Sequence, residues 1–234
     1  MRRLEGVRRR PETRRHTTGC AALDRLLPAG GLLGGTTVEW LSAQPGSGAG
    51  TLALIAASHA MAGGGVFVVM DRQRQFYLPA AAAFGIDVEN TIVVCPQNER
   101  DEFWALDQSL RCPAVAAVWS PLGKRSSRAL RRLQLAVESG GTLGLWLRPA
   151  SIRGQPCWSE TQLLVEPCPA RGPNRRLRVE LVRSRGGHPG GVVELEMDEL
   201  TGAVCEASHR HETHPLHLAP QLAPAATRRR SARA

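Results

Sequence analysis

A Gly-rich turn between an apolar strand and an Ala-rich run decides the fold. The stretch reads Val38-Glu-Trp-Leu-Ser-Ala-Gln-Pro-Gly-Ser-Gly-Ala-Gly-Thr51, and helix-forming residues follow it up to Met61. The apolar residues before the turn predict a strand at 38–41, and the Ala-rich run predicts a helix at 51–61. A strand, a Gly-rich turn and a helix in this order form the arrangement in which backbone N–H groups and a helix N-terminus hold phosphates.

The turn differs from a working phosphate loop at the positions that carry the chemistry. Such a loop reads G-x-x-x-x-G-K-[ST], in which the Lys reaches the β and γ phosphates and the hydroxyl holds Mg²⁺. In the best register Ala43 stands at the first Gly, Gly48 at the second, Ala49 at the Lys and Gly50 at the hydroxyl residue. A shift by one residue places Gly48 at the Lys, so no register restores the ammonium group. The amides of Gly46 and Gly48 remain as possible phosphate contacts, but the turn also fits a tight connection between a strand and a helix.

Short apolar strands alternate with helical patterns on both sides of this turn. Further strands are predicted at 66–70, 91–95, 114–118 and 142–147, with helices at 79–84, 101–110 and 128–138. Because crossover connections join parallel strands, the alternation predicts an α/β fold with a mostly parallel sheet flanked by helices. After residue 160 the helical patterns stop, and an antiparallel extension of the same sheet is predicted from strands at 161–166, 177–182 and 192–197.

The net charge of +9 is concentrated at the two ends of the 234-residue chain. Residues 1–15 hold seven Arg and two Glu, residues 228–234 hold four Arg, and the remaining 19 basic and 19 acidic residues cancel. We expect 1–15 to be a disordered basic tail, 16–206 to be one folded domain and 207–234 to be a disordered tail rich in His, Pro and Arg. The basic tails are either nonspecific phosphate contacts or solvated termini.

The chain shows no signal for a membrane, a secretory route or a metal site. Its apolar runs are shorter than the roughly 18 residues that a membrane span needs, and its Arg-rich start lacks the apolar part of a secretory signal. We therefore expect a cytoplasmic protein. The six cysteines include no CxxC pair, which indicates reduced thiols. The histidines at 209–217 lack the partners that fix a zinc geometry, so we interpret them as part of the tail.

The order of the motifs resembles that of RecA-type recombinases. A lead-in at 16–39, with a Leu-Asp pair, a Gly-Gly turn and a strand that carries Glu39, comes before the Gly-rich turn. Stretches that resemble later parts of the family follow in the same order, at 66–71, 84–96, 114–120, 128–147 and 178–185. The resemblance covers about residues 16–202. It implies a RecA-like sandwich of the P-loop type.

The departures from the family fall on its catalytic positions. The family's catalytic Glu corresponds to Gln73, and its metal-binding Asp at the end of the next strand corresponds to Trp119. The polar pair that ends its sensor strand corresponds to Arg148-Pro149. Without the ammonium group, the metal ligand and the base, we expect no ATPase and no cofactor, and we expect Trp119 to fill space that a nucleotide would occupy.

The sequence resembles the ImuA family of RecA-like proteins, which have about this size and lack the active site. The motif Leu-Trp-Leu-Arg-Pro-Ala at 145–150 and the stretch 178–190 carry this resemblance. This resemblance implies a cytoplasmic, damage-induced accessory protein of the translesion mutasome, which is associated with the nucleoid when in complex. The implied partners are ImuB, a homologue of Y-family polymerases, an error-prone C-family polymerase and RecA. Contact with DNA is expected to be weak or indirect. The alternatives are a divergent RecA-like ATPase, a SulA-like inhibitor of cell division and a nucleic-acid-binding module that works through the Arg tails.

Arg183 and Arg185 match a basic pair that reaches the nucleotide of the neighbouring protomer in RecA-type filaments. We hypothesise that they contact RecA, so that the chain caps or trims one end of a filament. They also fit two solvated arginines on an edge strand. Three tryptophans at 40, 104 and 146 are predicted to lie in the core, and Cys20 and Cys95 are predicted to be buried.

Overall fold

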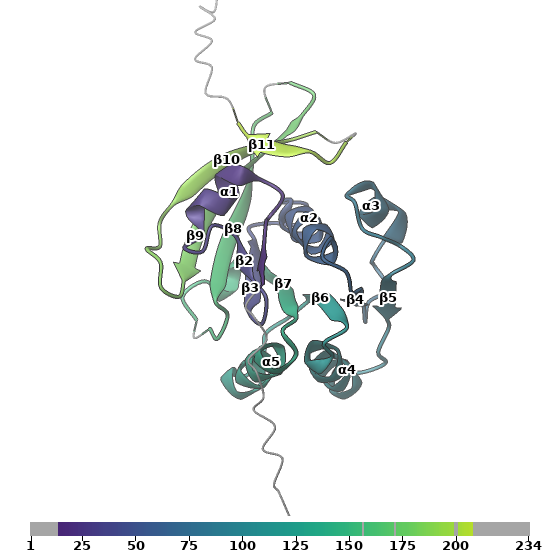
Figure 1. The fold of residues 1–234 in the computed structure, drawn as a ribbon. Coiled ribbons are helices and arrows are strands. Elements are labelled where there is room, and N and C mark those ends of the chain that lie inside the picture. The colour runs from purple at the N-terminus through teal and green to yellow at the C-terminus, as the bar shows by residue number, and fades with distance from the viewer. Residues whose placement is uncertain (1–13, 156, 171, 199–200, 208–234) are drawn as a thin grey trace, which may run out of the picture.

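The computed structural model describes residues 14–155, 157–170, 172–198 and 201–207 (Figure 1). The elements are β1 (Arg15–His16), α1 (Ala21–Leu26), β2 (Leu32–Leu33), β3 (Thr37–Ser42), α2 (Ala49–Met61), β4 (Val66–Met70), α3 (Leu78–Ala83), β5 (Thr91–Val94), α4 (Glu99–Arg111), β6 (Val115–Pro121), α5 (Ser127–Gly140), β7 (Leu143–Pro149), η1 (Ala150–Ile152), β8 (Thr161–Cys168), β9 (Arg175–Ser184), β10 (Val192–Met197) and β11 (Val204–Glu206). The chain folds as the α/β protein that the alternation predicts.

The main sheet has the strand order β11-β10-β9-β8-β3-β7-β6-β4-β5. The pairs from β8 to β5 are parallel, and those from β8 to β11 are antiparallel. The mostly parallel sheet with an antiparallel extension is therefore confirmed. One strand differs from the prediction: β8 runs parallel to β3, and the direction changes only between β8 and β9. The chain returns through η1 to the start of β3 before β8 begins, where Glu160 N donates to Thr37 O at 2.9 Å.

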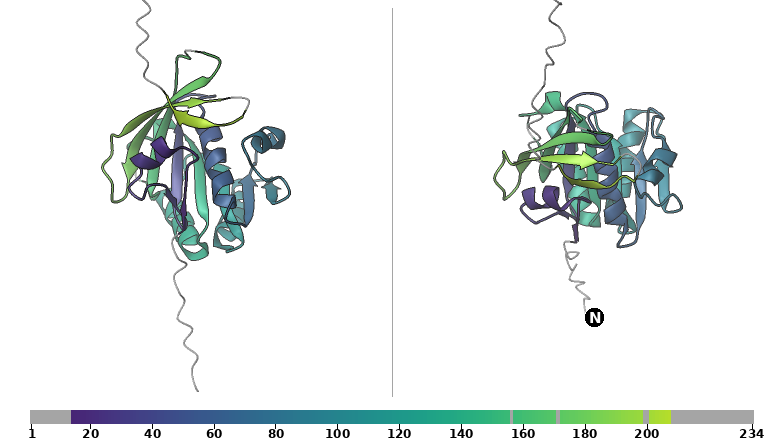
Figure 2. Two further views of the ribbon diagram at one scale, coloured as in Figure 1. Left: turned by 45° about the horizontal axis from the view of Figure 1, so that its top comes forward. Right: turned by 90° about the horizontal axis from the view of Figure 1, so that it is seen from above.

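Helices cover both faces of the sheet (Figures 1 and 2). Helices α1, α2 and α3 pack on one face, and their buried residues form a core cluster with Trp40, Phe67 and Leu177. Helices α4 and α5 pack on the other face around Leu106, Leu133 and a second group of strand residues. The two layers leave the carboxyl ends of the parallel strands at one edge, where open α/β sheets place their ligand sites.

Local sequence signals set the ends of the longer helices. The Asn98 side chain accepts a hydrogen bond from Asp101 N at 3.0 Å and caps α4, whose first turn is acidic. Ser126 caps α5 in the same way through Ala129 N at 3.2 Å. Helix α5 ends at Gly141, which has a φ of 78° that glycine adopts without strain.

The folded part reaches slightly beyond the predicted domain limits. Arg15 pairs with Leu33 across the small sheet of β1 and β2, and Ala207 N donates to Glu194 O at 2.8 Å. The rest of the two predicted tails, 1–13 and 208–234, lies outside the described residues. Within the described ranges, no helix combines the length and the apolar character that crossing a membrane requires.

Candidate functional site

The Gly-rich turn joins β3 to α2 and folds back on its own hydroxyl groups. Gly46 and Gly48 have φ angles of 75° and 94°, and α2 begins directly after Gly48. The Ser47 hydroxyl accepts a hydrogen bond from Ala49 N at 3.4 Å and lies 2.9 Å from the Ser42 hydroxyl. The first amide of α2 therefore has a partner within the turn, in the place where a phosphate loop presents its amides to the ligand.

Aliphatic side chains pack closely against this turn. A Cβ atom placed on Gly48 would lie 2.8 Å from both methyl carbons of Leu177 in β9. Ala49, which the sequence motif aligns with the Lys of a phosphate loop, is 1% exposed and belongs to the core cluster of α2. A Cβ atom on Gly50 would lie 3.6 Å from a methyl carbon of Leu147. The turn thus borders hydrocarbon on the side of β7 and β9.

The end of β4 is held by a carboxylate that does not face solvent. Asp71 is buried, and its two oxygens accept hydrogen bonds from Gln75 N at 3.0 Å and Phe76 N at 2.7 Å. The loop turns sharply at Arg74, which has a φ of 55°, a conformation that costs a residue with a side chain about 1 kcal/mol or more. Gln73, which the resemblance aligns with the family's catalytic Glu, lies exposed on this loop.

Trp119 in β6 is buried beside this loop. Its side chain is 7% exposed, and its ring centroid lies 5.5 Å from that of Phe76 at an angle of 53°. The Trp119 Nε1 atom is buried and has no hydrogen-bond partner among the described residues. Trp119 therefore acts as packing for the loop that Asp71 holds, and it offers no oxygen atom to a metal ion.

A pocket of 570 Å³ opens at the ends of β4, β6 and β7. Its lining comprises Met70, Asp71, Arg72, Gln73, Gln75, Phe76, Glu99, Glu102, Trp119, Pro121, Leu122, Gly123, Lys124, Arg125, Leu147 and Pro149. Ion pairs cross one wall, where Arg125 contacts Glu99 at 3.1 Å and Glu102 at 2.8 Å. Gln73 and Trp119, which are far apart in sequence, meet in this pocket. The Gly-rich turn itself does not line it.

A buried ion pair lies behind the turn, and the sequence motifs gave no sign of it. Glu39 Oε1 accepts a hydrogen bond from Arg148 Nη1 at 2.7 Å, and Glu39 Oε2 accepts one from Gln162 Nε2 at 2.6 Å. Both charged side chains are buried, and Arg148 Nε lacks a partner among the described residues. Burial, together with the charge of Glu39, raises the pKa of the neighbouring Cys157 thiol. Arg148, which the resemblance aligns with part of the family's sensor pair, thus has a structural partner in β3.

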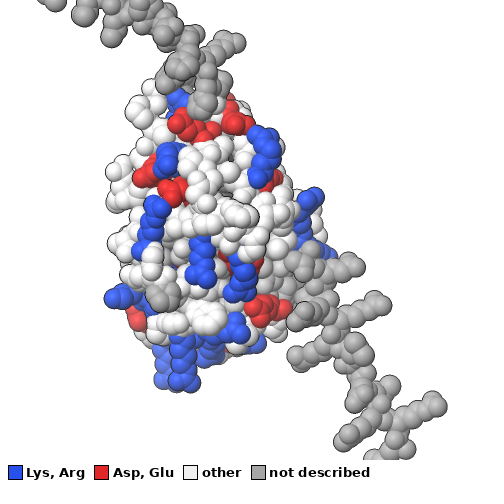
Figure 3. Space-filling model, turned by 90° about the vertical axis from the view of Figure 1, so that its left-hand side faces the viewer, with Lys and Arg blue, Asp and Glu red and all other residues white. Residues whose placement is uncertain are grey.

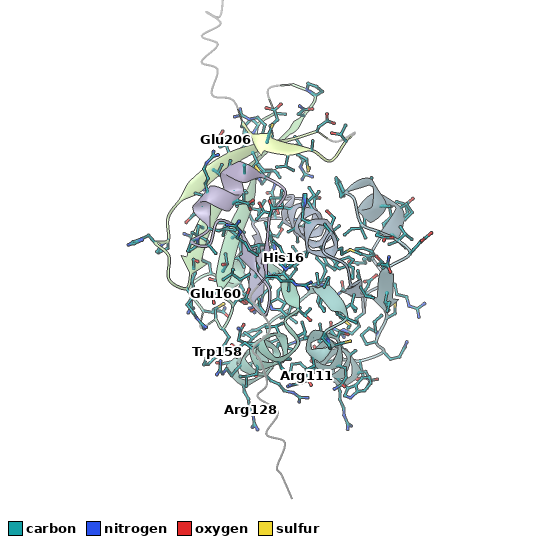
Figure 4. All side chains as sticks on the ribbon, in the orientation of Figure 1. His16, Arg111, Arg128, Trp158, Glu160 and Glu206 are labelled. Carbon is teal, nitrogen blue, oxygen red and sulfur yellow. The ribbon has the colours of Figure 1, made fainter. Side chains whose placement is uncertain are left out.

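Arg183 and Arg185 lie at the end of β9 that is remote from the turn. Leu177 touches the turn, and six residues of extended chain place Arg183 about 20 Å further along β9. Arg183 is exposed and pairs in register with Gln162, next to a bulge that leaves Val182 unpaired in the register. Arg185 Nε lies 3.7 Å from Glu160 Oε2. Burial raises the pKa of Glu160 (labelled in Figure 4), although the charges of Arg185 and Arg183 act in the opposite direction.

The structure corrects two predictions about buried residues. Trp40 and Trp146 lie in the core as predicted, but Trp104 on α4 is 63% exposed. The helical pattern allowed either Phe103 or Trp104 to face inward, and Phe103 takes that position. Cys20 is buried as predicted, whereas Cys95 is half-buried at the open end of β5.

Trp158 and the histidines at 209–217 differ in what the structure says about them. Trp158, which follows the sensor strand, donates a hydrogen bond to the Ser127 hydroxyl at 2.8 Å and lies under Arg131, whose Cζ is 4.7 Å from its ring centroid. The histidines at 209–217 lie outside the described residues. Within the described ranges, no group of three or more His, Cys, Asp or Glu side chains is arranged to hold a metal ion.

Comparisons with known proteins found relatives by sequence and by fold. No family model matches the chain. Two proteins named ImuA, from Caulobacter vibrioides strains NA1000 / CB15N and ATCC 19089 / CIP 103742 / CB 15, are each 29% identical to it over 178 residues, which cover 68% of this chain and 68% of each relative. The chain is a RecA-like homologue of ImuA.

The chain is also similar to RecA proteins and to the structure of a recombinase. RecA of Frankia alni is 26% identical over 160 residues, which cover 59% of this chain and 46% of that protein. RecA of Crocosphaera subtropica is 34% identical over 118 residues, which cover 50% and 33%. The crystal structure of the RadB recombinase superposes with a TM-score of 0.64 at 16% identity, covering 82% of this chain and 99% of that one. This last similarity shows the fold alone.

Proposed function

We propose that this ImuA homologue is a noncatalytic, RecA-like accessory protein of the SOS-induced translesion DNA synthesis mutasome. In this role it binds an ImuB-type homologue of Y-family polymerases and RecA, works beside an error-prone C-family polymerase, and supports mutagenic bypass of DNA lesions. The similarity to ImuA and the RecA-like fold support this assignment. The protein acts in the cytoplasm, at the nucleoid when in complex, and without a cofactor.

The contact between Leu177 and Gly48 carries the noncatalytic part of the proposal. Phosphoryl transfer depends on a positioned cation, a bound metal ion and a group that orients the attacking water. The corresponding positions here offer the buried methyl group of Ala49, the indole of Trp119 and the amide of Gln73. Leu177 packs so close to Gly48 that a Cβ atom there would lie 2.8 Å from its methyl carbons, so the turn adjoins hydrocarbon where it enters α2.

Nucleotide titration and phosphate release test this part directly. We expect the purified chain to show no Mg²⁺-dependent binding of a fluorescent ATP analogue at micromolar concentrations, and no phosphate release above background with or without single-stranded DNA. An active RecA serves as the positive control. The Leu177→Ala variant opens the turn without adding a cation, so it should remain inactive. Mg²⁺-dependent binding with turnover by the pure chain would instead establish a divergent RecA-like ATPase.

Partner binding requires a separate experiment. We expect the chain to co-elute in gel filtration with an ImuB-type polymerase homologue from the same genome, and to alter the assembly of RecA on single-stranded DNA. A mixture with the ImuB-type protein that elutes as two separate species at micromolar concentrations would contradict the mutasome role. Arg183 and Arg185 remain the candidate contacts to RecA, because they lie exposed at the end of β9 far from the turn.

A further inference from the structure

The exposed indole of Trp104 stands in a row of polar and basic side chains on the outer stripe of α4. Arg100 lies one turn before Trp104, Gln108 one turn after it and Arg111 two turns after it, and all of them are exposed. A single exposed aromatic residue is common on protein surfaces. An indole that is 63% exposed and flanked by arginines is less common, and one ligand could contact both its ring face and the neighbouring guanidinium groups.

Helix α5, which packs beside α4, places further basic side chains next to the exposed stripe of α4. The Arg132 guanidinium lies 5.1 Å from the centroid of the Phe103 ring, and its Nε donates to Asp107 at 3.1 Å. Helices α4 and α5 run in the same direction, and Arg132 contacts α4 at residues 103 and 107. Arg128 precedes Arg132 by one turn, so it lies level with the first turn of α4. Figure 4 shows Arg111 and Arg128 on the same lower side of the molecule. We call Arg100, Trp104, Arg111, Arg128 and Arg132 the α4–α5 surface.

The acidic residues of these two helices are all engaged. Glu99 and Glu102 pair with Arg125, and Asp101 accepts a hydrogen bond from Asn98. Asp107 is shared between Arg111 and Arg132, and Glu138 accepts a hydrogen bond from Gln134. Within the described residues, Arg100 and Arg128 form no ion pair. Figure 3, which shows the face on the side of α5, has Lys and Arg gathered at its lower end.

The order of charges along α5 is the opposite of what stabilises a helix. Acidic residues near the N-terminus and basic residues near the C-terminus favour the helix dipole, and α4 follows this rule. In α5 three arginines occupy the first half, the first turn holds no acid, and the last turn holds no base. Helix stability therefore does not explain Arg128, Arg131 and Arg132, although packing of Arg131 on Trp158 and of Arg132 on Phe103 holds two of them in place.

We propose that the α4–α5 surface binds single-stranded DNA, with a base stacked on Trp104 and backbone phosphates on the surrounding arginines. Exposed aromatic rings beside a basic track are the recurring means of holding single strands, and guanidinium groups match the geometry of phosphate oxygens. An acidic peptide would satisfy the arginines but would leave the indole face without a planar partner. The proposal does not depend on the noncatalytic role, because its test contains neither nucleotide triphosphate nor RecA.

Fluorescence anisotropy with the full chain and a labelled oligothymidylate of about 20 nucleotides provides the test. Trp104→Ala should weaken binding of the single strand at least about fivefold, and it should leave binding of a duplex unchanged because duplex bases are stacked on each other. Arg128→Gln should weaken both, and it should reduce the slope of log affinity against log salt by about one between about 50 and about 200 mM salt. The Arg-rich termini are present in every variant, so their contribution cancels.

Matched controls separate this surface from general effects. Two controls lie on other elements: Tyr77, which is 69% exposed at the start of α3, and Arg175, at the start of β9. Tyr77→Ala and Arg175→Gln should therefore bind DNA like the unmodified chain.

Equal affinity of Trp104→Ala and the unmodified chain for the single strand would overturn the proposal. Competition by polyglutamate as strong as that by the oligonucleotide would point to an acidic protein instead. A dimer by light scattering that Trp104→Ala dissociates, with DNA affinity unchanged, would assign the surface to a second copy.

Discussion

Leu177 of β9 closes over Gly48 of the Gly-rich turn, so the antiparallel part of the sheet packs directly against the segment that starts α2. The two methyl carbons of Leu177 each lie 2.8 Å from the position of a Cβ atom on Gly48. A hydrophobic side chain from β9 thus packs against the Cα of Gly48, directly before α2 begins. Because this contact belongs to the core cluster, changes in the turn should affect stability before they affect any ligand.

Gly48→Ala should destabilise the fold more than Gly46→Ala does. Both glycines have positive φ angles, which cost alanine about 1 kcal/mol. A Cβ atom on Gly46 meets nothing within 4 Å, whereas one on Gly48 meets Leu177. Overpacking adds about 1–3 kcal/mol, so urea unfolding should show a clear difference between the variants. Equal losses would mean that Leu177 moves aside freely.

Ala49→Lys should destabilise the chain without creating nucleotide binding. The methyl group of Ala49 is buried in the core cluster, so a lysine there must either bury its ammonium group or disrupt the packing of Leu177 and α2. Ala43→Lys is the matched control, because Ala43 lies exposed in the same turn. Thermal unfolding and fluorescent ATP titration check both parts. Micromolar Mg²⁺-dependent binding of the ATP analogue by Ala49→Lys would show that the Gly-rich turn can still hold a triphosphate and lacks only the Lys.

The sheet and its helices could be predicted because periodicity records which side of each element is buried. The alternation of buried strands such as 66–70 with amphipathic runs such as 128–138 left a parallel sheet as the main solution. The direction of β8 could not be predicted, since strand patterns carry no information about parallel or antiparallel partners. It depends on the route of 150–160 across the sheet.

The side-chain partners of the candidate site were harder to predict than its backbone. The pairing of Glu39 with Arg148 joins two strands that are neighbours only in space, and each residue alone fitted a motif position. Trp104 was predicted to lie in the core because Phe103 and Trp104 are adjacent aromatic residues, and the helical pattern does not say which of the two faces inward. The alignment of Ala49 with the Lys of a phosphate loop remains a prediction from the sequence, whereas the close approach of Leu177 to Gly48 could not be predicted.

The Glu39–Arg148 pair should behave as a coupled unit in a double-mutant cycle. Arg148→Met leaves the Glu39 carboxylate buried with Gln162 alone, which should cost about 3–5 kcal/mol in urea unfolding. Glu39→Gln combined with Arg148→Met removes both charges, and it should be more stable than Arg148→Met alone. Additive losses in the double variant would show that the two side chains contribute independently.

Asp107 should make the stability of α4 and α5 dependent on acid pH. Burial opposes ionisation of Asp107, but hydrogen bonds and charges from Arg132 and Arg111 outweigh it and lower its pKa. A carboxyl group with a lowered pKa in the folded state stabilises the fold above its unfolded pKa of about 3.9, and that contribution is lost as the pH falls through the folded pKa. The difference in unfolding free energy between the chain and Asp107→Asn should therefore be constant from about pH 7 to 5 and shrink below about pH 4. A difference that stays constant down to about pH 3 would contradict this linkage.

Arg183→Ala and Arg185→Ala should reduce the effect of the chain on RecA while leaving its own fold intact. Arg183 is exposed, and the Arg185–Glu160 pair at 3.7 Å lies near the surface, where such pairs contribute about 1 kcal/mol or less. Assembly of RecA on single-stranded DNA with ATP, followed by light scattering, measures the effect. The control is Arg175→Gln, which changes an arginine at the opposite end of β9 and should act like the unmodified chain. If a heterologous contact to one filament end operates through this part of β9, losing either arginine should weaken capping or trimming, and losing both should abolish it. An undiminished effect of the double variant on RecA would remove β9 from the contact and leave the proposed partnership to another surface.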